Sequence, residues 1–181
     1  TVLILIALPL IFVIATYNTL VALRNHIKES WSDVDTELQR RYELIPNLVS
    51  TVKGYAKHER ETLENIIELR NQCAADHGSV QHQQGTEKQL VAGVRTLFAI
   101  AEAYPDLKAD QNFLQLQQEL VNTEDRIQAA RRFYNGNVRD YANKRETFPS
   151  NIVANLFNFN PHDFFDVDPA TREAPSVKDA F

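Results

Sequence analysis

The chain is poor in cysteine, in glycine and in alternating strand patterns, and each shortage narrows the fold. Cys73 is the single cysteine of 181 residues, so neither an intramolecular disulfide nor a pair of thiolate metal ligands is available. Only five glycines occur, and Val, Ile and Thr rarely alternate with polar residues, which disfavours strands and hairpins. Because 44% of the residues are apolar, a core can still form, and we predict an all-α protein.

The sequence also lacks a basic face. The formal net charge is -5, and the lysines and arginines are dispersed among acidic residues. A protein that holds a phosphate backbone needs clustered positive charge. We therefore do not expect nucleic acid to be a partner.

Motifs of common catalytic sites are missing as well. None of the five histidines follows a glutamate by three residues, the spacing of di-iron bundles, and His58-Glu59 lacks the second histidine of a zinc protease helix. No nucleophile elbow or phosphate-binding loop occurs. We predict a protein that is not an enzyme, with no catalytic, cofactor-binding or metal-binding residue; His77 and His82 offer at most adventitious metal binding.

The longest apolar run lies at the N-terminus. Residues 1–23, TVLILIALPLIFVIATYNTLVAL, contain no charge and supply the roughly 20 apolar residues that a membrane span needs. The alternative is a cleaved signal sequence, which we disfavour because the helical phase continues through Val21 and Leu23 into Ile27. We predict a single transmembrane helix in contact with the lipid bilayer. The basic residues Arg24, Lys28 and Arg40 on its flank favour a cytoplasmic location for the bulk of the chain.

A stripe of apolar residues at spacings of three and four follows the span and indicates a long amphipathic helix. Its members are Trp31, Val34, Leu38, Tyr42, Ile45, Leu48, Val52, Tyr55, Leu63, Ile66, Leu69 and Cys73. Pro46 lies within this stripe without shifting its phase, so we predict one kinked, continuous helix rather than a reversal of the chain. Residues 75–88, rich in Gly, Gln and His, are predicted to be an exposed connection.

Two further helices are predicted, over about residues 87–104 and from Pro105 and the candidate cap Asp106 to Phe148. At ~1.5 Å per residue they measure roughly 27 Å and 60 Å, so an antiparallel arrangement leaves part of the longer helix without a partner from the shorter one. We infer that a neighbouring chain covers it and predict a homo-oligomer.

The bundle is expected to span residues 24–158 and to end in a short helix after Pro149. Residues 159–181 form an extended tail that is both acidic and aromatic. Phe157, Phe159, Phe164 and Phe165 need cover, which the bundle or a neighbouring subunit is expected to provide.

Charged residues gather in two places, around Arg40 and Arg41 and in the segment NTEDRIQAARRFYN. We favour interhelical salt bridges that set the helix pairing over a ligand site between subunits. The candidates for packing or for oligomer contacts are Trp31, Pro46, Arg131, Arg132, Phe157, Phe164 and Phe165.

Two long segments resemble the LemA family of bacterial membrane proteins. They are YNTLVALRNHIKESWSDVDTELQRRYELIPNLVSTVKGYAKHE and AEAYPDLKADQNFLQLQQELVNTEDRIQAARRFYNGNVRDYANKRETFPSNIVANLF, which lie between Tyr17 and Phe157. The resemblance implies one N-terminal membrane helix, a cytoplasmic bundle of long antiparallel helices, a location in the inner membrane and no established enzymatic activity.

We therefore expect a non-enzymatic, membrane-anchored scaffold that self-associates and either organises a membrane patch or recruits partners. The first alternative is a monomeric adaptor that binds an unidentified cytosolic protein through its tail. The second is an enzyme that uses Glu119 or Asp125 as a base, which would need a pocket with convergent polar groups.

Overall fold

The computed structural model describes residues 2–76 and 80–165, and within them every regular element is a helix. The predicted all-α class, with a long N-terminal apolar helix packed into a bundle, is confirmed. The helices are α1 (Val2–Tyr55), α2 (Arg60–Ala75), α3 (Val80–Glu102), α4 (Pro105–Lys108), α5 (Gln111–Glu146) and α6 (Ser150–Leu156).

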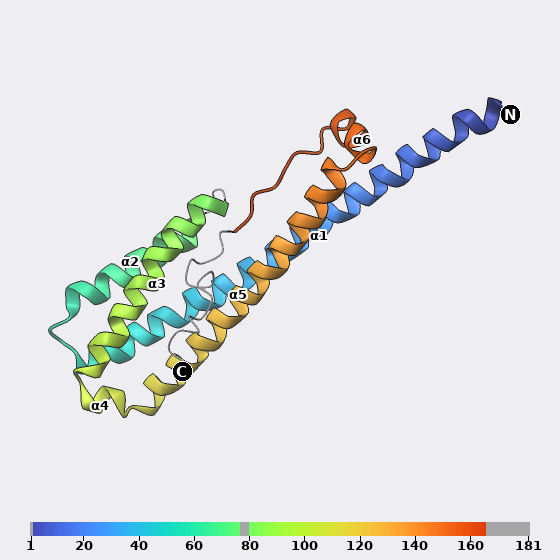
Figure 1. The fold of residues 1–181 in the computed structure, drawn as a ribbon. Helices are drawn as coiled ribbons and strands as arrows, with labels where there is room; N and C mark the ends of the chain where they lie inside the picture. The colour runs from blue at the N-terminus through green and yellow to red at the C-terminus, as the bar shows by residue number, and fades with distance from the viewer. Residues whose placement is uncertain (1, 77–79, 166–181) are drawn as a thin grey trace, which may run out of the picture.

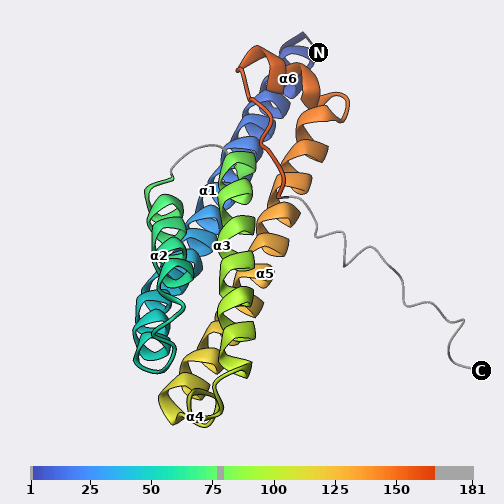
Figure 2. The same cartoon turned by 90° about the vertical axis from the view of Figure 1, so that its left-hand side faces the viewer.

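Helices α1 and α5 run antiparallel along one another and form the spine of the molecule (Figure 1). Helices α2 and α3 pack as a hairpin beside the C-terminal half of α1, and α4 closes the same end (Figure 2). The short helix α6 lies at the opposite end, where the N-terminal part of α1 projects beyond the bundle. The molecule is therefore a rod with an apolar helix leaving one end.

Helix α1 buries most of the predicted stripe, but the last member of the stripe in this helix, Tyr55, is 41% exposed. The residues Leu20, Ile27, Val34, Leu38, Tyr42, Ile45, Leu48 and Val52 are all buried in the core. Their spacing of seven residues, or of three and four, holds one face of the helix against α5 and the hairpin. Trp31 lies half-buried at the edge of this core.

The helix passes through Pro46 without interruption, as predicted, and the structure gives this proline a role. Proline has no N–H, so the carbonyl of Tyr42, four residues earlier, loses its partner within the helix. Arg70 of α2 donates its Nε–H to this carbonyl at 2.9 Å. Pro46 thus opens a hydrogen-bond acceptor on α1 that helps to fix the position of α2.

The prediction that the stripe continues in one helix as far as Cys73 is wrong. Helix α1 ends at Tyr55, the chain turns at residues 56–59, and α2 returns along α1. The turn AKHE contains neither glycine nor proline, and Ala56 is itself buried. Because α2 must bury an apolar stripe too, the pattern on either side of the turn is the same as in an uninterrupted helix.

The predicted connection over residues 75–88 is also much too long. Helix α3 begins at Val80, and its first turns bury Gln84 and Glu87, two polar residues in the segment interpreted as exposed. Similarly, Asp106 lies in the one-turn helix α4, whereas Asp110 caps α5 by accepting a hydrogen bond from the N–H of Phe113 at 2.9 Å.

Other segments of the same chain cover the C-terminal half of α5. Helix α1 runs beside it, and residues 157–165 fold back from α6 along its side. The hydroxyl of Tyr141 donates to the carbonyl of Asn160 at 2.9 Å, and Asn135 exchanges two hydrogen bonds of 2.9 Å with the backbone of Phe165. The length of α5 therefore does not by itself require a neighbouring chain. Residues 166–181 of the predicted tail lie outside the described residues.

Replacing Arg70 by Met should lower the free energy of unfolding by about 1–2 kcal/mol, because the carbonyl of Tyr42 is left without a donor. In a Pro46→Ala background the new N–H of residue 46 reaches that carbonyl, so the cost of Arg70→Met should fall to less than about 0.5 kcal/mol. Unfolding in mild detergent, followed by circular dichroism, measures both costs.

The matched control is Arg60→Met, an exposed arginine that, within the described residues, pairs with Glu64 of its own helix, at 2.6 Å. Its cost should stay within about 0.5 kcal/mol in both backgrounds. Equal costs of Arg70→Met with and without Pro46 would refute the role of the freed carbonyl.

Candidate functional site

A network of charged side chains lies inside the bundle. Arg41 of α1 is 1% exposed, although it carries a full positive charge. Its guanidinium forms ion pairs with Glu87 of α3 and with Glu124 of α5, the latter at 2.6 Å between Nη1 and Oε1. The neighbouring Tyr42 donates its hydroxyl to Glu87 as well. One arginine therefore ties α1, α3 and α5 together at a single level of the rod.

Burial changes the acid-base properties of this network. The pKa of Tyr42 is raised to about 12, first because the phenol is desolvated, against the opposing effect of the charge on Arg41. The pKa of Arg131 is lowered to about 10, again mainly by burial and then by the nearby charge of Arg41. At neutral pH Tyr42 therefore stays protonated and Arg131 stays charged.

The two candidate arginines, Arg131 and Arg132, lie in different environments. Arg131 points inward and places its guanidinium 5.1 Å from the centre of the Phe165 ring, while Arg132 is exposed. The Phe165 ring also stacks on Trp31, with 5.5 Å between the ring centres. Trp31, Arg131 and Phe165 thus form one packed cluster, in which the arginine contacts the ring as a cation.

The remaining candidates lie elsewhere. Phe164 is 46% exposed next to the buried Phe165, and Phe157 contacts Tyr17 near the N-terminal end, with 4.9 Å between their rings. Pro46 is half-buried and acts through the carbonyl of Tyr42. The sequence does not reveal the buried Glu87, because the glutamine-rich residues before it predict an exposed loop.

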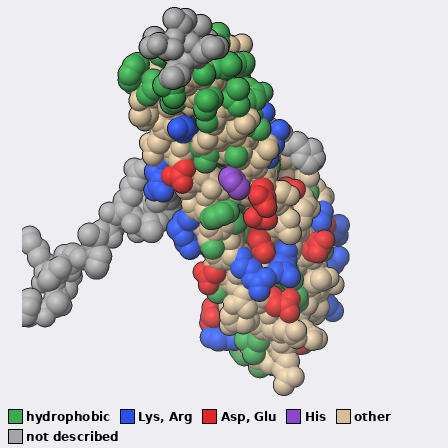
Figure 3. Space-filling view, turned by 90° about the vertical axis from the view of Figure 1, so that its right-hand side faces the viewer, with side chains coloured by type: hydrophobic (Ala, Val, Ile, Leu, Met, Phe, Trp, Pro, Cys, Tyr) green, Lys and Arg blue, Asp and Glu red, His purple; other side chains and the backbone are tan. Residues whose placement is uncertain are grey.

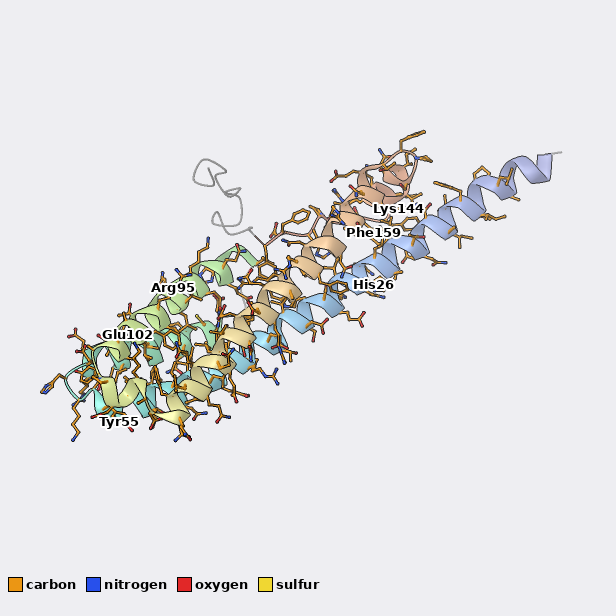
Figure 4. All side chains as sticks on the ribbon, turned by 60° about the horizontal axis from the view of Figure 1, so that its bottom comes forward. His26, Tyr55, Arg95, Glu102, Lys144 and Phe159 are labelled. Atoms are coloured by element: carbon orange, nitrogen blue, oxygen red, sulfur yellow. The ribbon has the colours of Figure 1, made fainter. Side chains whose placement is uncertain are left out.

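A groove of about 740 Å³ lies between α3 and α5, and the residues of the charge network line part of it. Arg41 forms part of its floor, and Val91, Phe98 and Val121 give it an apolar lining. The exposed charges on its walls are distributed unequally: Lys88 and Arg95 lie on α3, and Asp125 lies on α5 beside the half-exposed Glu124. Figure 4 labels Arg95 on α3. The fully exposed charges are thus basic on α3 and acidic on α5, while the half-exposed Arg131 also lines the α5 side and the buried Glu87 the α3 side.

The suggested enzymatic bases do not converge. Asp125 lies on the groove between α3 and α5, whereas Glu119 lines a different hollow, of about 250 Å³, together with Arg40 and Asn122. Among the described residues, no three His, Cys, Asp or Glu side chains form a group that could hold a metal ion. His82 is bonded through Nδ1 to Asp76 at 2.7 Å, and His77 lies outside the described residues.

The N-terminal end of the rod is apolar. Leu8, Leu10, Ile11, Phe12 and Ile14 of α1 are all exposed. Within the described residues, α1 is the one helix that is long and apolar enough to cross a membrane. The space-filling view shows hydrophobic side chains gathered at this end, with basic side chains next to them (Figure 3).

The fold and the apolar end of α1 define a class of protein: all-α rods in which one helix supplies both a candidate membrane anchor and part of the core of a bundle. The model of the LemA family matches residues 30–178, and the chain belongs to this family. The predicted resemblance to this family is thereby confirmed; the match begins at residue 30, after the first residues of the segments that resemble the family, and extends further into the tail, to residue 178.

Three named relatives match most of the chain. Protein LemA of Metamycoplasma hominis is 29% identical over 162 residues, which cover 86% of this chain and 74% of the relative. Magnetosome protein MamQ 1 of Paramagnetospirillum magneticum and magnetosome protein MamQ of Magnetospirillum gryphiswaldense are each 22% identical over 179 residues. The matches cover 85% of this chain and 66% of each MamQ protein.

Replacing Arg41 by Met should destabilise the bundle by about 3–5 kcal/mol, because Glu87 would remain buried without its ion pair. Thermal unfolding in mild detergent measures the loss. The control is Arg132→Met, an exposed arginine on α5, whose cost should stay within about 0.5 kcal/mol. A loss below about 1 kcal/mol for Arg41→Met would show that the network contributes little.

Proposed function

We propose that this protein is a non-enzymatic scaffold that is anchored in a membrane by α1 and self-associates through the groove between α3 and α5. The observation that carries the proposal is the groove itself, a partly apolar surface whose fully exposed charges are basic on α3 and acidic on α5. Anchoring is supported by the length and composition of α1. The basic residues Arg24 and Lys28 favour a cytoplasmic bundle.

Anchoring restricts the ways in which two copies can meet. Two rods whose apolar helices enter the same membrane from the same side must lie parallel, so a two-fold axis between them must run along the membrane normal. Such an axis exchanges the two sides of a facing surface, and α3 of one copy then lies opposite α5 of the other.

The charge pattern of the groove fits this symmetry. Lys88 on α3 of one copy would face Asp125 on α5 of the other, and the same pairing would occur twice. Apolar residues such as Val91 and Val121 would be buried between these pairs. A surface that is complementary to itself under the symmetry imposed by the membrane favours a second copy as its occupant.

An adaptor remains the second candidate function. It is favoured by the acidic composition of residues 159–181, of which residues 159–165 are engaged with α5. In this case the groove would stay open, and a cytosolic protein would bind the tail.

The first test is the mass of the full chain in mild detergent, measured by size exclusion with light scattering. We expect a dimer or a larger even-numbered assembly. Lys88→Glu should convert it to a monomer through repulsion from Asp125, and the double variant Lys88→Glu/Asp125→Lys should restore it by exchanging the two charges. A monomeric parent protein would overturn the proposed self-association.

The control is Glu61→Lys, an exposed charge reversal on α2 outside the groove, which should leave the mass unchanged. Reversal of Arg131 is a poorer probe, because its guanidinium also packs on Phe165 within the chain.

Removing residues 166–181 separates the scaffold from the adaptor. This truncation leaves the contacts of Phe165 with Asn135 in place. A scaffold should keep its mass in detergent, whereas an adaptor should lose the capture of its cytosolic partner in a pull-down. Loss of the assembly on truncation would show that the tail, and not the groove, joins the subunits.

A further inference from the structure

We propose that α6 and the residues beside it form a second membrane contact, an apolar collar that lies in the interfacial zone of the bilayer next to α1. The collar consists of Phe148, Ile152, Leu156 and Phe157. This second contact rests on the proposed membrane anchoring by α1. It adds to that anchoring a contact from the opposite end of the chain. Its occupant is the lipid surface itself.

The collar residues are unusually exposed for their chemistry. Phe148 is 75% exposed, Leu156 69%, Ile152 59% and Phe157 46%. Single exposed apolar side chains are ordinary, but four within ten residues at one end of a rod form a patch that is costly in water. This patch requires cover.

Helix α6 presents this patch because its other face is fixed to the bundle. Val153, Ala154 and Ser150 are buried. The hydroxyl of Ser150 donates to the carbonyls of Lys144 and Thr147 at 2.7 and 2.8 Å, and Arg145 donates its Nε–H to the carbonyl of Phe159 at 2.8 Å. The exposed side chains are thus held outward by polar and apolar contacts on the opposite side.

The collar lies at the level where α1 leaves the bundle. Tyr17 contacts Phe157 and Phe159, with ring centres 4.9 and 5.6 Å apart. Phe12 and Leu23 line one hollow together with Phe148. These α1 residues extend from the middle of the uncharged run to its end at Leu23, just before Arg24. If α1 crosses a bilayer, the collar must therefore lie against the same side of it.

The charges below the collar fit a headgroup layer. Lys144 lines the hollow with Phe148, and Arg24 lies with its guanidinium 5.4 Å from the centre of the Phe159 ring. Figure 4 shows Lys144 and Phe159 close to α6. The acids of this region, Asp140 and Glu146, are paired with the arginines that precede them, Arg139 and Arg145, at 3.4 and 3.2 Å. Apolar residues followed by cations are typical of interfacial membrane contacts.

Spin labels on single cysteines test the collar in the full chain, reconstituted in vesicles of phosphatidylcholine and phosphatidylglycerol. The background is Cys73→Ala, which removes the one native thiol. Labels are placed at Ile152→Cys and Leu156→Cys in the collar, at Leu10→Cys in the exposed part of α1, and at Leu114→Cys on α5 at the distal end. The measurement compares collisions with oxygen, which enters lipid, and with a water-soluble nickel chelate.

We expect the oxygen-to-nickel ratio at both collar positions to be several-fold higher than at Leu114, and to approach that at Leu10. Collar labels that resemble Leu114 while Leu10 remains in lipid would overturn the collar and leave the anchor intact. Collar labels protected from both reagents would show that a second copy, and not lipid, covers the patch. A label at Leu10 that is accessible to the nickel chelate, and so lies in water, would overturn both the anchor and the collar.

Discussion

The structure depends on one constraint, the continuity of α1. This single helix of 54 residues, about 81 Å long at ~1.5 Å per residue, carries the apolar N-terminal segment and then one face of the bundle core. Because no hinge separates the two parts, a membrane that holds the first part also sets the direction of the rod. Helix α5 packs along α1 and inherits that direction, and α6 is thereby placed where α1 leaves the bundle.

We infer that the buried network around Arg41 helps to set the register of the bundle. Apolar stripes can slide past one another by a turn at modest cost, but a buried arginine must meet its carboxylates at one level. Glu87 and Glu124 satisfy Arg41 from two different helices, and Arg70 adds a polar contact to the carbonyl freed by Pro46. Polar contacts of this kind contribute less to net stability than to the choice of one helix arrangement.

In the proposed function, these features act together at a membrane. The family to which the chain belongs does not specify an activity, so the surfaces of the rod carry the functional argument. A rod fixed upright can meet a second copy only side by side, and the groove between α3 and α5 has fully exposed charges of opposite sign on its two walls, which such a meeting favours. The collar at the other end would hold α5, as well as α1, against the lipid.

The sequence by itself determined the helical class, the apolar N-terminal helix and the passage of α1 through Pro46, because period, charge and composition act locally. It did not reveal the turn after Tyr55, since two consecutive helices that bury the same face repeat the pattern of one. It also hid Glu87, whose carboxylate is acceptable in the core only because Arg41 and Tyr42 arrive from another helix. The unequal walls of the groove and the outward face of α6 likewise depend on which helices become neighbours. That choice follows from long-range packing and ion pairing, and therefore only the tertiary structure decided it.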